Sequence, residues 1–279
     1  MKRAGVIGWP VAHSLSPVLH GYWLRQYGIA GAYEKIPAAP QDFAAAIARL
    51  RGEGYAGVNV TVPHKEAAFA LAQDNDAAAK LAGASNLLVF HADHLEGRNT
   101  DSYGLMASLR ENIGPLAGES VVLLGAGGAA RGAAVALDQL GAGTIHLLNR
   151  DKARAASLAA MLAPRLNARL LPGALADWRE AAGDAVLAVN STSAGMGDNP
   201  PLALDLSALP KDAAVCDIVY HPLETPLLKE AQASGRRTID GLGMLMHQAA
   251  PSFEAFFGAW PDVTPGLRAA LVKALHERP

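Results

Sequence analysis

The chain has 279 residues, of which 51% are hydrophobic and 18% charged, with a formal net charge of -2, a composition typical of a globular protein. The lack of a basic excess argues against a nucleic-acid partner, and no apolar run reaches the roughly 18 residues of a membrane span. The single cysteine, Cys216, excludes internal disulfides and a thiolate metal cluster, and the nine histidines lack metal-ligand spacing, so we expect a cytoplasmic protein without a bound metal.

The first predicted elements are a short apolar strand at residues 4–7 and a helix that begins near Pro17. Two hydroxyl side chains, Ser14 and Ser16, lie in the loop between them. Proline is favoured in the first turn of a helix, so Ser16 is a candidate N-cap and Ser14 a turn residue. Alternatively, the two hydroxyls and the unpaired N–H groups of the helix start bind an anion such as a carboxylate. Taken alone, the pattern favours the cap.

Strands and helices then alternate along the chain. Residues 33–36 form a predicted second strand, and Phe43, Ile47 and Leu50 share one face of a predicted helix. This alternation predicts a parallel sheet joined by right-handed crossover connections.

A third predicted strand, in residues 57–65, has two chemically different faces. Strict alternation sends three valines, the last of them Val62, to a buried face, and sends Asn59 and Thr61 to the opposite face. The proline after Val62 ends the strand, so Lys65 lies just beyond it, near the start of a helix. The polar face is either one wall of a binding cleft or the solvent-facing side of an outer strand, and this stretch does not decide between the two.

Residues 84–90 form a further predicted strand, with Asn86 near its start and a hairpin turn at residues 91–94. Asp101 then precedes a helix that carries Leu105. Aspartate is a common helix cap, so this residue alone does not indicate chemistry.

A second module begins with the apolar residues 121–124, the pattern of a buried strand in a parallel sheet. The turn that follows has the pattern Gly-x-Gly-x-x-Ala, and a helix continues from it through Leu140. In dinucleotide-binding turns the first glycine permits the tight turn, the second lets the backbone approach the pyrophosphate, and the small third residue allows close helix packing. The sequence therefore predicts a dinucleotide site around Gly125 and Gly127.

The next predicted strand, residues 144–148, leads into Asn149 and Arg150, where an NAD-binding unit usually carries an acidic residue for the ribose. Arg150, together with Arg154 one turn further along, offers planar cationic groups to a 2′-phosphate, so NADP is the expected cofactor. Asp151 argues against strict selectivity, because its charge would lie beside the same phosphate. In the alternative interpretation, both arginines are solvated residues at a helix start.

The last third of the chain continues the alternation. Strands are predicted at residues 185–190, 214–219 and 238–240, and helices at residues 253–257 and 265–275. The first of these strands ends in a small, flexible loop that contains Thr192 and Ser193, and the second ends at Tyr220. Another helix carries Gln248. The two final helices have apolar faces too broad for isolation, so we expect them to pack against the first module.

Six motifs together resemble the shikimate dehydrogenase family, over almost the whole chain and in the family's order. They are His13–Pro17, Asn59–Lys65, Asn99–Asp101, Gly125–Ala129, Asn149–Arg150 and Asp240–Leu245. The resemblance implies an α/β fold with a parallel-sheet catalytic domain at residues 1–101 and 242–279 and a Rossmann-like NADP-binding domain at residues 102–241, with the C-terminal helices returning to the first domain. It also implies the reversible, NADP-dependent reduction of 3-dehydroshikimate to shikimate, on the pathway to chorismate and aromatic amino acids.

The resemblance further assigns roles to individual residues. Lys65 and Asp101 match the catalytic acid/base pair. The matched substrate-binding residues are Ser14, Ser16 and Tyr220 for the carboxylate, and Asn59, Thr61, Asn86 and Gln248 for the ring hydroxyls. The matched cofactor-binding residues are Gly125, Ala126, Gly127, Gly128, Ala129, Asn149, Arg150, Arg154, Thr192, Ser193, Gly241 and Met244. The expected partners are the small-molecule substrate and either no second subunit or one identical copy.

Three departures from the family's pattern keep alternatives open. Asp151 stands where the family often has threonine, Ser85 replaces a common apolar residue, and Ser102 replaces a common glycine. The first departure allows a quinate or dual quinate/shikimate dehydrogenase that uses NAD. An alternative of another class is a dinucleotide-sensing protein that keeps the fold without turnover.

Overall fold

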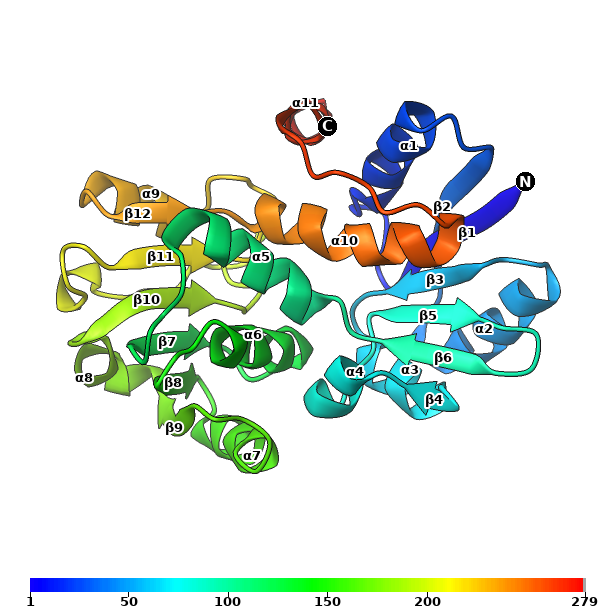
Figure 1. The fold of residues 1–279 in the computed structure, drawn as a ribbon. Coiled ribbons are helices and arrows are strands. Elements are labelled where there is room, and N and C mark those ends of the chain that lie inside the picture. The colour runs from blue at the N-terminus through cyan, green and yellow to red at the C-terminus, as the bar shows by residue number, and fades with distance from the viewer. Residues whose placement is uncertain (278–279) are drawn as a thin grey trace. The chain divides into compact units, whose positions relative to one another are not determined.

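The computed structural model describes residues 1–277, and the chain divides into two compact units (Figure 1). Unit 1 contains residues 1–100 together with the chain from Met246 onward, and unit 2 contains Asp101–Leu245. Each unit is built around a six-stranded sheet. None of the helices within residues 1–277 is long and apolar enough to cross a membrane.

The sheet of unit 1 is mixed. Its strands are β1 (Lys2–Gly8), β2 (Gly31–Pro37), β3 (Gly57–Val60), β4 (Asp74–Asn75), β5 (Leu87–Phe90) and β6 (Leu95–Arg98), in the order β2-β1-β3-β5-β6-β4. The predicted parallel pairing is present between β1 and both β2 and β3. Strand β4, which the sequence did not predict, pairs in parallel with β6. The predicted hairpin is confirmed as β5 and β6, so β5 runs antiparallel to both of its neighbours.

Helices cover both faces of this sheet. They are α1 (Ser16–Gln26), α2 (Phe43–Gly52), α3 (Lys65–Leu71), α4 (Ala77–Ala82), the part of α10 (Gly241–Phe257) from Met246 onward, and α11 (Pro265–His276). On one face, Phe43, Ile47 and Leu50 of α2 pack in one core with Val58 and Val60 of β3, which confirms the predicted amphipathic helix.

An aromatic cluster covers the opposite face, where α1 and α10 meet β2. His20 stacks on Tyr33 with ring centroids 3.9 Å apart, and Trp23 packs edge-on against Phe253 at 5.4 Å. The Trp23 indole N–H also donates to the carbonyl of Asp262, between α10 and α11, at 3.0 Å. The C-terminal helices therefore return to the first module, as predicted.

One predicted boundary in this region is wrong. The helix expected at residues 253–257 is not separate, because α10 runs without a break from Gly241 to Phe257 and contains Pro251. A proline inside a helix removes one backbone donor and commonly produces a kink or a break. Here the aromatic side chains that follow it remain on the face that packs on the sheet, and this burial holds the helix together.

The sheet of unit 2 is entirely parallel. Its strands are β7 (Ser120–Leu124), β8 (Thr144–Asn149), β9 (Arg169–Ala174), β10 (Ala185–Asn190), β11 (Ala214–Asp217) and β12 (Arg237–Ile239), in the order β12-β11-β10-β7-β8-β9. Its helices are α5 (Asp101–Ile113), α6 (Gly128–Gln139), α7 (Lys152–Leu162), α8 (Trp178–Ala182) and α9 (Pro226–Ala233). The sequence did not predict β9, an edge strand that contains Pro172, or the short α8.

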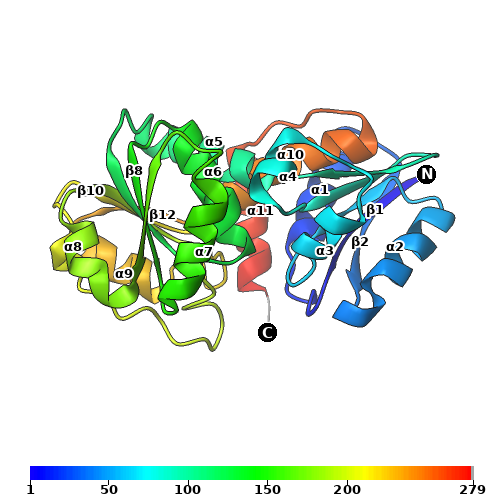
Figure 2. The same cartoon turned by 90° about the horizontal axis from the view of Figure 1, so that it is seen from below.

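Successive residues of the central strands enter two separate cores. Leu123 and Val189 pack with α5, α6 and α7, whereas Val122 and Ala188 pack with α8 and α9 on the other face (Figure 2). Buried on both faces, these strands are continuously apolar, which is why the sequence identified them. The arrangement is the doubly wound, Rossmann-like fold that was expected.

Candidate active site

Strand β3 lies inside the unit 1 sheet, between β1 and β5. Its polar face was predicted to be either one wall of a cleft or a solvent-facing surface. The alternative of a solvent-facing outer strand is therefore wrong, and Asn59 is only 7% exposed. The strand ends at Val60, earlier than predicted, and Val62 is 66% exposed instead of buried. The reason is a turn, closed by the hydrogen bond from the His64 N–H to the Thr61 carbonyl at 3.0 Å, that begins before the proline.

The Asn59 side chain is held by three hydrogen bonds inside unit 1. Its oxygen, Oδ1, accepts from the Tyr33 hydroxyl at 2.7 Å. Its nitrogen, Nδ2, donates to Ser252 Oγ at 2.8 Å and to the Asn86 carbonyl at 3.3 Å. The polar face of β3 thus belongs to a buried network that draws on β2, β3, α10 and the start of β5.

A second group of polar side chains surrounds Asn86. Its Oδ1 accepts from the Thr100 N–H at 2.7 Å, and its Nδ2 donates to Thr100 Oγ1 at 3.0 Å and to Gln248 Oε1 at 3.5 Å. The structure therefore brings together three predicted substrate-binding residues of unit 1: Asn59, Asn86 and Gln248. Thr100, Tyr33 and Ser252 were not predicted, because their roles depend on partners distant in sequence.

The two serines at the start of α1, Ser14 and Ser16, do not have the capping roles that the sequence favoured. The N-cap position is occupied by Leu15, and Ser16 is the first helical residue, so the prediction of Ser16 as N-cap is wrong. Ser14 Oγ accepts the Ser16 N–H and donates to Ser16 Oγ, both at 3.2 Å. Ser16 also acts on the Tyr33 hydroxyl, because it opposes the rise in the Tyr33 pKa that burial causes. Both serines thereby join the network around Asn59.

The remaining predicted residues of unit 1 lie at the carboxyl end of β3. Thr61 is half-buried directly after the strand, and its methyl group lies so close to Gly8 that a side chain at Gly8 would collide with it. Lys65 was expected near the start of a helix and is the first residue of α3, and its carbonyl accepts the Ser85 N–H at 2.9 Å.

In unit 2, the predicted dinucleotide turn lies at the switch point of the sheet, where β7 is flanked by β8 and β10. Gly125 has a φ of 115°, and a side chain there would lie 2.8 Å from Ser191 Oγ, so only glycine fits. At Gly127 and Gly128, in contrast, an added Cβ would meet no atom within 4 Å. The open space beside these glycines fits the close approach of a pyrophosphate to the backbone.

A buried carboxylate organises the adjacent loops of unit 2. Asp217, at the end of β11, accepts from Asn190 Nδ2 at 3.0 Å, from the Val219 N–H at 3.0 Å and from Thr225 Oγ1 at 2.8 Å. Asn190 Oδ1 in turn accepts from the Thr192 hydroxyl at 2.7 Å. Burial raises the pKa of Asp217. The sequence analysis missed this network, although an aspartate at the end of an apolar strand was a visible signal.

The expected 2′-phosphate clamp lies where β8 leads into α7. Asp151 is the N-cap of α7, since its carboxylate accepts the Ala153 N–H at 2.9 Å, and its carbonyl accepts from Asn149 Nδ2 at 2.9 Å. Arg150 and Arg154 are exposed, and neither guanidinium has an ion-pair partner within residues 1–277. The two arginines thus have charges available for an anionic phosphate, while the Asp151 carboxylate is hydrogen-bonded to the helix backbone. This arrangement suits a 2′-phosphate better than the sequence alone suggested.

Four further predicted residues also lie in unit 2. Asp101 is buried and is the first residue of α5, and Tyr220 is half-buried after β11. Gly241, at the start of α10, lies against the carbonyl of Ile218, and a side chain would collide with it. Met244 packs against the core formed with α5 and α6. Within residues 1–277 no three His, Cys, Asp or Glu side chains are arranged to hold a metal ion.

A glycine turn at the switch point of a parallel sheet places the chain in the class of dinucleotide-binding α/β proteins, and a second unit in the same chain holds a cluster of amide side chains. Residues 6–88 match the family model of the shikimate dehydrogenase substrate-binding domain. A shikimate dehydrogenase (NADP(+)) of Mesorhizobium japonicum is 49% identical over 284 residues, covering 100% of this chain and 98% of the relative. The chain belongs to the shikimate dehydrogenase family.

Solved structures support the same assignment. The shikimate 5-dehydrogenase of Thermus thermophilus, in complex with NADP(H) and shikimate, is similar with a TM-score of 0.87 and 35% identity, covering 98% of this chain and 100% of that one. A quinate dehydrogenase of Corynebacterium glutamicum, in complex with NAD, gives a TM-score of 0.89 at 33% identity, covering 98% and 99%. The predicted family and fold class are therefore confirmed.

Proposed function

We propose that the chain catalyses the reversible, NADP-dependent reduction of 3-dehydroshikimate to shikimate. The observation that carries this proposal is the hydrogen-bonded cluster in unit 1 of the buried Asn59 and Asn86 and the half-buried Gln248, because a substrate with several ring hydroxyls requires several fixed polar partners. Lys65 begins the helix that follows the same strand. The 49% identity to a shikimate dehydrogenase (NADP(+)), which extends over the whole of this chain, supports the choice of substrate.

The proposed chemistry assigns proton transfer to Lys65 and Asp101. Bound NADPH supplies the hydride, and the carbonyl oxygen that gains negative charge then needs a proton donor or a cation. Lys65 can provide both, and Asp101 is its proposed partner in the acid/base pair. In the oxidation direction Lys65 accepts the proton of the hydroxyl. Ser14, Ser16 and Tyr220 would bind the substrate carboxylate, and Thr61 would share the ring hydroxyls with the amide cluster.

Unit 2 is the proposed cofactor-binding unit. The backbone at Gly125–Ala129 would bind the pyrophosphate, as the open space at Gly127 and Gly128 supports. Asn149, Arg150 and Arg154 would bind the adenosine 2′-phosphate, and Thr192, Ser193, Gly241 and Met244 would contact the rest of the cofactor. The proposed domain limits remain residues 1–101 with 242–279 for the substrate and 102–241 for the cofactor.

A second candidate function is a quinate or dual quinate/shikimate dehydrogenase that uses NAD. Two observations favour it: the negatively charged Asp151 beside the clamp, and the similarity to the quinate dehydrogenase crystallised with NAD. Steady-state rates with shikimate and quinate, each with NADP⁺ and NAD⁺, separate the two. We expect the highest kcat/KM for shikimate with NADP⁺, whereas a higher value for quinate with NAD⁺ would replace the first proposal by the second.

The same absorbance assay at the reduced nicotinamide band separates an enzyme from a dinucleotide-sensing protein. A sensor would bind NADP⁺ without producing NADPH from any of the substrates. We also propose a cytoplasmic location, because the lone, buried Cys216 suits a reducing compartment. A monomer or a homodimer is the proposed assembly, and light scattering during gel filtration distinguishes these two.

A further inference from the structure

The Asn59 side chain has little hydrogen-bonding capacity left for a ligand. An amide group has two N–H donors and two acceptor lone pairs. Both donors of Nδ2 are engaged, by Ser252 Oγ at 2.8 Å and by the Asn86 carbonyl at 3.3 Å. One lone pair of Oδ1 is engaged by the Tyr33 hydroxyl at 2.7 Å. The remaining capacity is one lone pair of Oδ1, so Asn59 can accept one further hydrogen bond and can donate none.

Tyr33 is itself held at both ends of its side chain. Its ring lies parallel to that of His20, with an interplanar angle of 5° and centroids 3.9 Å apart. Its oxygen gives its only proton to Asn59, so toward Ser16, which opposes the rise in the Tyr33 pKa that burial causes, it can act only as an acceptor. The direction of the hydrogen bond from Tyr33 to Asn59 is thereby determined.

We propose that Tyr33 is a positioning residue that fixes the orientation of the Asn59 amide, so that Asn59 meets a ring hydroxyl of the substrate only as an acceptor. This inference rests on the proposed function, since it concerns how the same site recognises the same substrate. Tyr33 does not need to touch the substrate for this role, because it acts through the amide oxygen that it binds.

The consequence for recognition is a requirement for a donor on the substrate. A hydroxyl at the position facing Asn59 can give its proton to the free lone pair, whereas a fluorine or a hydrogen at that position cannot. A buried acceptor left without a donor loses its hydrogen bond with water and gains nothing in return. The wild-type site should therefore reject the fluoro and deoxy analogues at one ring position more strongly than at the others.

The test uses Tyr33→Phe, which removes the hydroxyl and keeps the ring that stacks on His20. Without the hydroxyl the amide oxygen loses its hydrogen bond from Tyr33, and the orientation of the amide then depends on the two hydrogen bonds of Nδ2. We therefore expect the KM for shikimate to rise roughly tenfold, with kcat changed by less than about twofold. The ratio of kcat/KM for shikimate to that for the fluoro or deoxy analogue at the sensitive position should fall by a similar factor. In combination with Asn59→Ala, the Tyr33 substitution should have almost no further effect on kcat/KM, because the group it positions is absent.

Tyr55→Phe is the matched control, because the Tyr55 hydroxyl also donates to a side chain of unit 1, Glu34 Oε2 at 3.0 Å, but has no contact with Asn59. It should leave KM and analogue discrimination unchanged. If Tyr33→Phe lowers the unfolding midpoint and the active fraction but leaves KM and discrimination as in wild type, its role is merely structural and the inference is wrong.

Additive effects of Tyr33→Phe and Asn59→Ala on kcat/KM would also overturn the inference, since they would show that Tyr33 acts independently of Asn59. These outcomes differ from a failure of the proposed function. In that case the wild-type chain itself would not oxidise shikimate, whereas here the wild-type enzyme is active and only the pattern among the variants contradicts the role of Tyr33.

Discussion

Arg150 and Arg154 present two cations at the start of α7, and neither has an ion-pair partner within residues 1–277. Between them, the Asp151 carboxylate is engaged with the backbone of the helix that it caps. Charge-assisted contacts with a phosphate are among the stronger polar interactions, so these arginines should decide which cofactor binds. Asp151 contributes mainly to the stability of the helix start.

We expect Arg154→Ala to raise the KM for NADP⁺ by roughly tenfold or more and to leave the KM for NAD⁺ nearly unchanged, since NAD⁺ lacks the 2′-phosphate. Arg169→Ala is the control, because Arg169 is an exposed arginine at the first residue of β9. Steady-state kinetics with both cofactors measure the effect. Equal losses with NADP⁺ and NAD⁺ would show that Arg154 does not contact the 2′-phosphate.

The Asp151→Thr variant separates the capping role from the effect of the charge. Threonine retains an oxygen that can cap the helix, so the unfolding midpoint should change little. Removal of the negative charge should raise the ratio of kcat/KM for NADP⁺ to that for NAD⁺ by several-fold. If the ratio stays constant while Asp151→Ala lowers stability by about 1 kcal/mol, Asp151 is a cap alone and does not weaken cofactor selectivity.

Among single residues, the sequence analysis identified those that stand in a distinctive local pattern. It missed those whose hydrogen-bond partners are distant along the chain. Asn59 stood out because it interrupts the valines of a strand. Tyr33 and Ser252 did not, because Tyr33 lies 26 residues from Asn59 and Ser252 lies 193 residues from it. Only tertiary contact reveals that these hydroxyls bind the amide of Asn59.

At the scale of elements, the contact of α1 with β2 and α10 contains an unusual residue. His20 is fully buried, and its two ring nitrogens have no hydrogen-bond partner within residues 1–277. Burial lowers its pKa from 6.5 to about 3. The surrounding side chains are Trp23, Tyr33, Phe253, Phe256 and Phe257.

This histidine should make the fold sensitive to acid. The folded protein keeps His20 neutral, whereas the unfolded chain can protonate it. The free energy of unfolding therefore falls as the pH drops from about 6.5 to about 3, by at most about 1.4 kcal/mol per pH unit. We expect His20→Phe to be at least as stable as wild type at pH 7, with an advantage that grows toward pH 5. Thermal unfolding at several pH values measures this.

The control for His20 is the exposed His276 of α11, for which His276→Gln should show no growing advantage. If the difference in thermal stability between His20→Phe and wild type stays constant from pH 7 to pH 5, His20 does not cause the acid sensitivity. It would indicate that His20 already gains a proton in the folded protein within this range.

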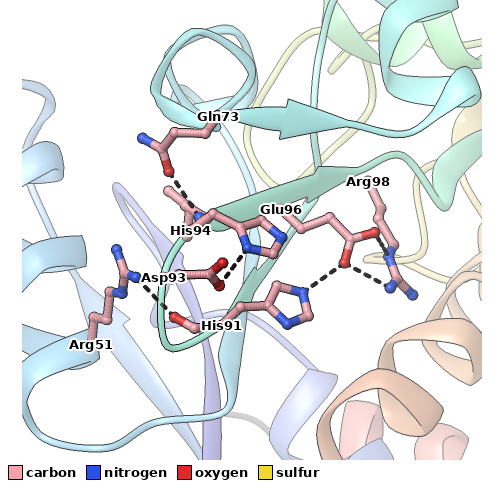
Figure 3. A network of polar contacts seen from close by, with 8 residues as sticks. Arg51, Gln73, His91, Asp93, His94, Glu96 and Arg98 are labelled. Atoms are coloured by element: carbon pink, nitrogen blue, oxygen red, sulfur yellow. Dashed lines mark hydrogen bonds and ion pairs between the residues drawn. The ribbon is translucent and has the colours of Figure 1, made fainter.

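The β5–β6 hairpin, which begins directly after Asn86, is stabilised by ion pairs that share Glu96 (Figure 3). Glu96 accepts from Arg98 Nε at 2.7 Å and Nη2 at 2.8 Å, and from His91 Nε2 at 2.9 Å. The hydrogen bonds from Arg98, followed by that from His91, lower the pKa of Glu96 from 4.5 to about 2. The carboxylate therefore stabilises the fold only while it is ionised.

Glu96→Gln should lower the free energy of unfolding at pH 7 by about 1 kcal/mol, a modest figure because the Arg98 side chain is partly exposed to solvent. The contribution is complete above a pH of about 4.5 and is lost as the pH falls toward about 2, so wild type and variant should converge in acid. Denaturant unfolding at pH 7 and pH 3 measures both differences. Glu230→Gln, at an exposed position of α9, is the control and should change neither.

At the scale of the whole molecule, the sequence predicted the fold class, the two modules and the return of the C-terminal helices. Each rests on a strong local signal: continuously apolar strands, the glycine turn, and broad apolar helix faces. The sequence did not predict β9 with its Pro172 or the continuous α10 with its Pro251. Both depend on packing that overrides the usual effect of proline.

The central claim is that this chain oxidises shikimate with NADP⁺ and that Lys65 transfers the proton. The most direct test is kcat for wild type and Lys65→Ala, with Lys80→Ala of α4 as an exposed lysine control. We predict an active wild type, an unaffected control, and a loss of roughly 10²- to 10⁴-fold in Lys65→Ala with shikimate binding largely retained. A wild-type chain without turnover, or a Lys65→Ala variant with near-normal kcat, would contradict this claim.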